Sequence, residues 1–266
     1  MKAWLAIVCS LCISIGHAQS FEGTIRWKIS LDITNPQVLA NIEQTKKEQQ
    51  DSSSKIKARE IREKMADPEV ARKLKADPEL KKKMEAMLQV LEGAGVDDLL
   101  PKSIEVKLKN KNSLTTVSGG PYNNYQVLYK ADKDLTYFIR HDEKTYSVIA
   151  NATTVPTRKF GHKPEDKIKV LGYTCTKYFK AEMTDDLKSR MTIYWATDEL
   201  KGIDIQTLAM RHMGKDKSFI YPEIPAFPMK IVQTLNEGDM TMEVIEINKG
   251  KLSPDVFEIP AGYVVR

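Results

Sequence analysis

The chain has 266 residues, 41% of them hydrophobic and 29% charged. This balance is ordinary for a soluble globular protein, and it excludes wholesale disorder. The formal net charge of +5 is too small to indicate nucleic-acid binding. Beyond the first residues no apolar run reaches the ~18 residues of a membrane-spanning helix, so we expect no transmembrane span in the mature chain.

Residues 1–18 have the pattern of a secretory signal peptide. Lys2 gives a positive start, residues 3–15 are apolar, and small residues at Gly16 and Ala18 suit a cleavage site. We expect cleavage after Ala18, export, and a location in the periplasm or at the outer membrane. The alternative is an uncleaved anchor, which the short apolar core disfavours.

The cysteines favour a protein without disulfides. Cys9 and Cys12 follow large apolar residues, whereas an acylated lipoprotein cysteine needs a small residue before it. Cleavage removes both and leaves Cys175, which cannot form an internal disulfide and has no metal-binding or CxxC spacing. We predict that Cys175 is buried and packs as a small apolar side chain. A reactive thiol would need a lowered pKa, and only Lys177 lies nearby to lower it.

The mature chain begins with a predicted antiparallel strand over residues 21–31. Apolar residues alternate there with polar ones, so one face is buried and the other wet. The buried face carries Ile25, Trp27, Ile29 and Leu31.

A charged segment over residues 36–100 interrupts the strand pattern. The phrase Ala-Asp-Pro-Glu occurs at Ala66–Glu69 and again at Ala76–Glu79. Each copy predicts a helix start, because Asp caps free amides, Pro fits the first turn, and Glu favours the positive end of the dipole. We expect two or three short amphipathic helices here, preceded by a polar break at residues 51–54. They could form a lid, dock an envelope partner, or be a solvated helical hairpin.

From residue 103 onward the strand pattern returns, with turn signals at short spacing. We predict strands over 168–180 and 191–196, a short helix from Asp198 toward Met213, and a hairpin of 229–235 with 240–247. A change of parity near Val244 predicts a bulge. Residues 151–166 are expected to form a loop.

These elements predict an α+β fold. Eight to eleven strands with one dry face form a curved antiparallel sheet or open β-barrel covered by helices. The expected domains are the leader 1–18, a β domain of 19–34 plus 101–266, and the helical insertion 36–100.

Five phrases resemble the DUF4412 family of exported proteins, found mainly in Bacteroidetes. That family is similar to the outer-membrane lipoprotein carrier-like fold, a curved antiparallel sheet wrapped around helices. The resemblance covers about residues 20–34 and 101–263 and implies this fold. It transfers no catalytic residues, and it gives no meaning to residues 36–100. The phrases are Phe21–Ile25, Lys144–Tyr146, Lys169–Tyr178, Ile193–Thr197 and Val256–Tyr263.

Catalytic motifs are missing from the sequence. His141, His162 and His212 have no metal-ligand spacing, and there is neither a nucleophile elbow nor a phosphate loop. The carboxylate pairs Asp97-Asp98 and Asp185-Asp186 fall in expected turns. We therefore expect a protein that is not an enzyme and has no metal or cofactor.

An apolar cavity remains as the candidate site. A lipid or other hydrophobic ligand would gain roughly 0.8 kcal/mol per buried CH₂ in such a lining. The same side chains could instead fill a core, and periodicity does not separate the two. A second alternative is an envelope scaffold that docks a partner through residues 36–100. The expected lining is Trp27, Tyr129, Phe138, Tyr146, Trp195, Phe227, Met229 and Met242, with adaptable surface from Met210, Met213 and Met240.

Overall fold

The computed structural model describes residues 20–49, 52–92, 101–120, 125–150, 159–183, 189–205, 208, 220–235 and 238–266. Residues 1–18, which the sequence predicts to be a leader, lie outside these residues, as do His212, Met210, Met213 and both carboxylate pairs. Within the described ranges, no helix is long and apolar enough to cross a membrane.

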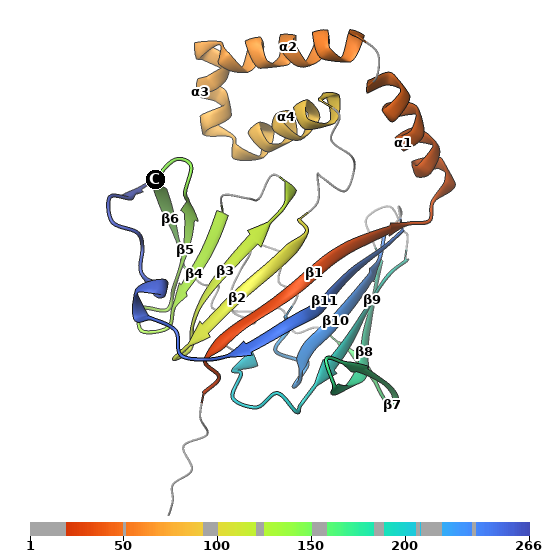
Figure 1. The fold of residues 1–266 in the computed structure, drawn as a ribbon, viewed down its shortest axis with the longest axis vertical. Coiled ribbons are helices and arrows are strands. Elements are labelled where there is room, and N and C mark those ends of the chain that lie inside the picture. The colour runs from red at the N-terminus through yellow and green to blue at the C-terminus, as the bar shows by residue number, and fades with distance from the viewer. Residues whose placement is uncertain are drawn as a thin grey trace, which may run out of the picture.

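The described strands form one open sheet with 12 strands (Figure 1). Its order is β12-β6-β5-β4-β3-β2-β1-β11-β10-β9-β8-β7, and only β12 pairs in parallel. The α+β class with a curved, mostly antiparallel, open sheet is therefore confirmed. The strands are β1 Gly23–Ile33, β2 Ser103–Lys109, β3 Asn112–Ser118, β4 Tyr125–Lys130, β5 Leu135–Arg140, β6 Thr145–Ala150, β7 Gly161–Val170, β8 Tyr173–Met183, β9 Ser189–Thr197, β10 Phe227–Thr234, β11 Gly238–Lys249 and β12 Val264–Val265.

The sheet buries opposite faces in its two halves. Val106 on β2 lies in a first core and pairs with Thr115 on β3. Leu114, the neighbour of Thr115, therefore points to the other face, where it joins a second core with Leu128. The first core draws on β1–β3 and β7–β11, and it is covered by Leu200, Leu208, Ile220, Ile224 and Ala226.

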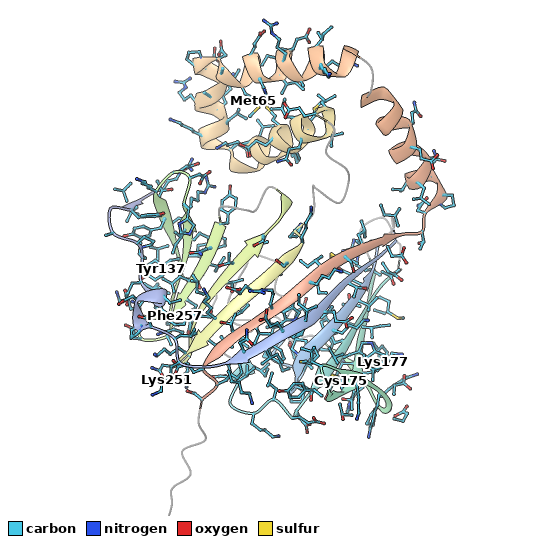
Figure 2. The ribbon with its side chains drawn as sticks, in the orientation of Figure 1. Met65, Tyr137, Cys175, Lys177, Lys251 and Phe257 are labelled. Carbon is cyan, nitrogen blue, oxygen red and sulfur yellow. The ribbon has the colours of Figure 1, made fainter. Side chains whose placement is uncertain are left out.

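The C-terminal segment covers the second core. A short 3-10 helix, η3 Pro254–Phe257, is capped by Ser253, whose side chain accepts from the Asp255 amide. It places Phe257, only 2% exposed, against the core that includes Tyr137 (Figure 2). Strands β3, β4 and β5 are buried on both faces, because Thr115, Val127 and Thr136, on the face opposite the second core, are also at most 8% exposed. Strands β1 and β2 instead have one buried face and one more accessible face.

Four helices connect β1 to β2. They are α1 Pro36–Gln49, α2 Ser52–Ala66, α3 Pro68–Ala76 and α4 Pro78–Leu91. They pack on one another beyond one end of the strands (Figure 1), so the described cover of the first core comes from the segment after β9 instead. Two or three helices were expected. The prediction missed α1, although Asn35 caps it by accepting from the Gln37 and Val38 amides.

The predicted caps and bulge are present. Asp67 accepts from the Glu69 and Val70 amides at 2.9 and 3.2 Å, and Asp77 accepts from the Leu80 amide at 3.0 Å. In the β1–β11 ladder the register shifts between Arg26, which pairs with Glu246, and Trp27, which pairs with Val244. The bulge therefore lies at the expected place.

The region around residue 171 corrects the prediction. The single strand expected over 168–180 is two strands, because Leu171 and Gly172 form a tight hairpin turn with φ of 50° and 85°. The loop expected over 151–166 becomes strand β7 from Gly161 onward. Pro164 and a register shift after Lys163 interrupt its pairing with β8, features that are tolerated because β7 is an edge strand.

Candidate functional site

Four of the eight expected lining residues fill the first core. The Trp27 and Phe227 rings lie 5.6 Å apart between centroids, and the Trp27 indole donates to the Pro228 carbonyl at 3.4 Å. Met229 is fully buried and Met242 is 6% exposed. These side chains contact one another as a packed core does.

Tyr129 and Phe138 lie on neighbouring strands of the same face. Val127 pairs with both Thr115 and Phe138, which places Phe138 on the face of the first core. Tyr129, two residues after Val127, is 7% exposed, and its hydroxyl donates to the Asp134 carboxylate at 3.0 Å.

Tyr146 and Trp195 are not among the buried members of the first core, although Trp195 packs against its margin. Tyr146 packs against the second core. Trp195 pairs with Lys177 and Lys230, and the Lys177 ammonium lies 5.7 Å from its ring centroid. The buried positions of β9 are Thr192, Tyr194 and Ala196, together with Thr197 at its end. Met191, Ile193 and Trp195 are the more apolar set, but the register turns the other set toward the centre of the core and leaves Trp195 at its margin.

The described lining of the larger cleft includes none of these eight residues. This helix–sheet cleft, of about 700 Å³, lies between the helices and the edge of the sheet. Its apolar wall comes from α2 and α3, where Leu74 is 5% exposed and Met65 points from α2 toward α4 (Figure 2). The lining residues are Met65, Ala71, Leu74, Lys75, Lys81, Arg140, Glu143, Thr145, Val265 and Arg266.

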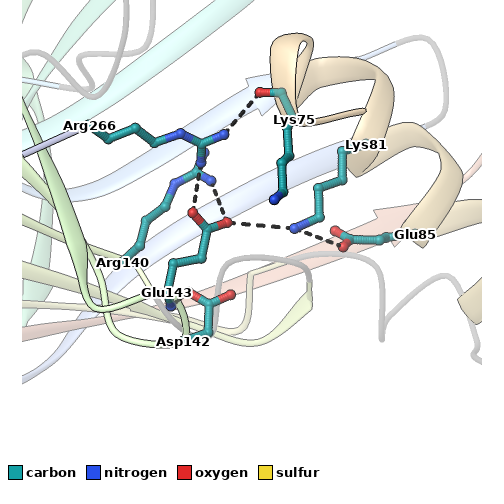
Figure 3. Close-up of polar contacts among 7 residues, drawn as sticks. All are labelled: Lys75, Lys81, Glu85, Arg140, Asp142, Glu143 and Arg266. Carbon is teal, nitrogen blue, oxygen red and sulfur yellow. Dashed lines mark hydrogen bonds and ion pairs between the residues drawn. The ribbon is translucent and has the colours of Figure 1, made fainter. Parts of the chain in front are cut away.

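Glu143 is the centre of the polar side of the helix–sheet cleft (Figure 3). Its carboxylate contacts Arg140 Nη1 at 3.0 Å and Arg266 Nη1 at 2.7 Å. The Lys81 ammonium lies 3.6 Å from Glu143 and 3.7 Å from Glu85. Burial acts to raise the pKa of Glu143, but Arg140, Arg266 and Lys81 outweigh it and hold that pKa below its ordinary value.

Local backbone structure positions these groups. Arg140 ends β5 and Glu143 lies in the following turn. Strand β12 runs beside β6, with the Val264 amide donating to the Lys144 carbonyl and the Arg266 amide to the Tyr146 carbonyl. Arg266 is thereby fixed next to the turn, and its Nη2 donates to the Lys75 carbonyl at the end of α3 (2.9 Å). The polar contacts therefore tie the helices to the sheet.

A second, smaller cleft of about 280 Å³ lies at the other end of β2. Its apolar side chains Phe21, Leu108 and Leu208 belong to the first core. The Phe21 amide donates to the Gly202 carbonyl at 2.8 Å, which closes the wall. It is the weaker candidate because it is smaller and because its apolar side chains already belong to the core.

The described histidines and Cys175 contact neighbouring side chains or lie buried in the core. His141 Nδ1 lies 2.8 Å from the Tyr263 hydroxyl, and His162 stacks on Tyr178 with centroids 4.2 Å apart. Within the described ranges, no group of His, Cys, Asp and Glu could hold a metal ion. Cys175 is fully buried, as expected, and burial raises the pKa of its thiol to about 11.

Sequence reasoning missed the residues of the helix–sheet cleft. In the sequence, His141–Lys144 resembles a turn between strands and Lys81 resembles one of many charges in the helical segment, and no local pattern links the two. The available signal was the density of opposite charges in this turn, with Arg140 and Glu143 three residues apart.

Several solved structures resemble the chain distantly, three of them with the following identity, TM-score and coverage. An uncharacterised conserved protein from Thermus thermophilus is 8% identical, with a TM-score of 0.37 over 62% of this chain and 80% of that chain. LprF from Mycobacterium bovis is 9% identical, with a TM-score of 0.28 over 63% of this chain and 84% of that chain. The Mycobacterium tuberculosis lipoprotein LppX is 11% identical, with a TM-score of 0.31 over 66% of this chain and 98% of that chain. No curated protein matches the sequence. These likenesses are too weak to bear on function.

One family model matches more than half of the chain. It is described as "Domain of unknown function (DUF4412)" and covers residues 100–263. The match spans the sheet from β2 to the segment that covers the second core, and it leaves out residues 20–34 as well as the four helices. The resemblance found in the sequence is thereby confirmed over its larger part, and the chain belongs to the DUF4412 family.

Proposed function

We propose that this protein is exported to the cell envelope and binds a lipid or other hydrophobic small molecule in the helix–sheet cleft, without catalysing a reaction. The observation that carries the proposal is the pairing of an apolar wall with a charged rim in a space of about 700 Å³. Small-molecule sites are typically about 300–1,000 Å³, mostly apolar, with a few polar groups that orient the ligand.

The energetics favour a ligand with a hydrocarbon chain. Met65, Ala71 and Leu74 form a wall on two adjacent helices. Each CH₂ placed against such a wall contributes up to about 0.8 kcal/mol. A chain of several carbons therefore gives useful affinity without any catalytic group. The leader 1–18 supports an envelope location, at the periplasm or the outer membrane.

Dye binding tests the proposal on the mature protein. N-phenyl-1-naphthylamine should fluoresce on binding, and native mass spectrometry of gently purified protein should detect a co-purified ligand. Ala71→Gln places a larger polar side chain on the apolar wall and should weaken dye binding at least about fivefold. Ala76→Gln, at the exposed end of the same helix, is the matched control and should not. Absence of dye binding by the unaltered protein refutes the proposal. If the two variants bind the dye equally well, the helix–sheet cleft is not the binding site.

A second candidate function is an envelope interaction module. One observation favours it, because the helices expose large apolar side chains: Leu39, Ile56, Leu80 and Met87 are 43–59% exposed. Ile56→Lys with Met87→Lys would then abolish crosslinking to a partner in intact envelopes while dye binding stays unchanged. Unchanged crosslinking in this double variant would exclude the helix surface as the docking site.

A further inference from the structure

We infer that the ligand of the helix–sheet cleft is a single-chain amphiphile with an anionic head, a carboxylate or a phosphate, which replaces the Glu143 carboxylate between Arg140 and Arg266. The inference rests on the proposed function and names its ligand class. It begins from an imbalance in the lining, which holds the four cations Lys75, Lys81, Arg140 and Arg266 but one carboxylate, Glu143. In the described part of the chain, only Lys81 has a further carboxylate, that of Glu85, at 3.7 Å.

The two guanidinium groups are held together by backbone structure. Arg140 ends β5, and Arg266 follows β12, which pairs with β6. Their side chains are 18% and 37% exposed, so their mutual repulsion is only partly screened by water. An anion between them relieves that repulsion, and Glu143 supplies it in this structure (Figure 3).

Glu143 is a replaceable anion because it lies in an exposed turn rather than in a strand. Each arginine uses one nitrogen, Nη1, to bond it. Carboxylates and phosphates present two or more oxygens in a geometry that suits paired guanidinium groups. A ligand head could therefore take both bonds while Glu143 turns toward solvent.

Two further groups in the lining suit an anionic head. No described carboxylate forms an ion pair with the Lys75 ammonium, which lies near the same cluster (Figure 3). The Thr145 hydroxyl is buried, and within the described residues it has no hydrogen-bond partner. A buried hydroxyl without a partner is unfavourable, and it can donate to a ligand oxygen.

The apolar wall specifies the rest of the ligand. Met65, Ala71 and Leu74 line the same cleft as the cations. A free anion would leave that wall exposed to water, and an uncharged chain would leave the cations without a new partner. An anionic head on one hydrocarbon chain satisfies both sides.

Three probes test the inference on the full mature protein at pH 7.5 and constant ionic strength, below micelle-forming concentrations. Dodecanoate has head and chain, dodecanol has the chain alone, and inorganic phosphate has the charge alone. In dye displacement, the affinity of dodecanoate should exceed that of dodecanol by at least about tenfold, a difference of about 1.4 kcal/mol in binding free energy. Phosphate should not displace it at millimolar concentration.

Variants assign the effect to named side chains. Arg266→Gln and Arg140→Gln should each weaken dodecanoate about tenfold and leave dodecanol unchanged. Glu143→Gln removes the competing carboxylate and should tighten dodecanoate binding relative to dodecanol. Loss of helix docking alone would weaken both probes equally, and that result would overturn the displacement of Glu143. Arg59→Gln, on an exposed α2 residue paired with Glu63, is the control and should change neither, and circular dichroism checks folding.

The outcomes separate the inference from the proposed function. Equal affinity for dodecanoate and dodecanol, with no effect of Arg266→Gln, overturns the anionic head and leaves hydrophobic binding standing. If phosphate binds as tightly as dodecanoate, the inference that the ligand carries a hydrocarbon chain is wrong. No binding of any probe, including the dye, refutes the proposed function itself.

Discussion

Replacing Phe227 by alanine tests whether the Trp27 face of the sheet is a packed core or a ligand cavity. Phe227 is 1% exposed, and its ring lies 5.6 Å from that of Trp27. Met229 and Val244, in the same core, are 0% and 1% exposed. Truncating a phenylalanine in such surroundings costs about 3–5 kcal/mol, because transfer energy is lost and a cavity remains.

Urea unfolding of the mature protein measures this cost. Tryptophan fluorescence reports on the sheet, since Trp27 and Trp195 both lie in its strands. The midpoint should fall while the slope with urea stays constant, so that the change reflects stability alone. Met191→Ala, on a side chain that is 42% exposed, is the matched control. It should change stability by no more than about 0.5 kcal/mol.

Ligand binding gives the second half of the test. Phe227→Ala should leave dodecanoate affinity unchanged, because Phe227 does not line the helix–sheet cleft. A stability cost below about 1 kcal/mol, together with altered dodecanoate binding, would refute the reasoning. The Trp27 face would then be the lining of a ligand cavity, as the sequence first suggested.

Three further predictions concern the helices and the thiol. The pKa of Glu143 is lowered in the folded protein, so its contribution to docking the helices is full above about pH 4.3 and is lost as pH falls through the lowered pKa. The protection factors of amides in α3 and α4, which correct for the intrinsic pH dependence of hydrogen exchange, should therefore fall at acid pH, and Glu143→Gln should lower them already at pH 7 and remove most of that pH dependence. Asp67→Ala and Asp77→Ala should each cost about 1 kcal/mol of helix stability, seen as loss of helical circular dichroism on mild heating; unchanged melting of both variants would contradict the capping role. Cys175 should resist dithiobis(nitrobenzoic acid) at pH 8 and react once urea unfolds the sheet, because its thiol is buried with a pKa of about 11; rapid reaction of the native protein would contradict this.

Local patterns predicted the elements where one physical requirement dominates. Alternation identified β1 because Ile25 and Trp27 must be buried while Thr24 and Arg26 face water. The two Ala-Asp-Pro-Glu phrases identified helix starts because capping is a local hydrogen bond. The parity change at Val244 identified a bulge because one extra residue in a strand reverses which face the following side chains occupy.

Hydrophobicity and register disagree on β9. The more apolar set includes Trp195, but pairing with Lys177 and Lys230 turns this ring away from the centre of the first core, so that it packs at the margin. The Lys177 ammonium lies 5.7 Å from the ring centroid there, which allows a cation–π interaction. Register depends on partners that are distant in sequence, so a pattern within one strand does not contain it.

The helix–sheet cleft lies beyond local patterns for a related reason. Lys81, Glu143 and Arg266 each resemble an ordinary exposed charge, and only the parallel pairing of β12 with β6 and the docking of α4 unite them. Arg140 and Glu143 fall inside the family match of residues 100–263, whereas the helices and Arg266 fall outside it. The cleft therefore combines a turn of the shared domain with segments beyond that match. A ligand bound there would be selected by features particular to chains that carry such helices, and the fold of the sheet alone would not predict it.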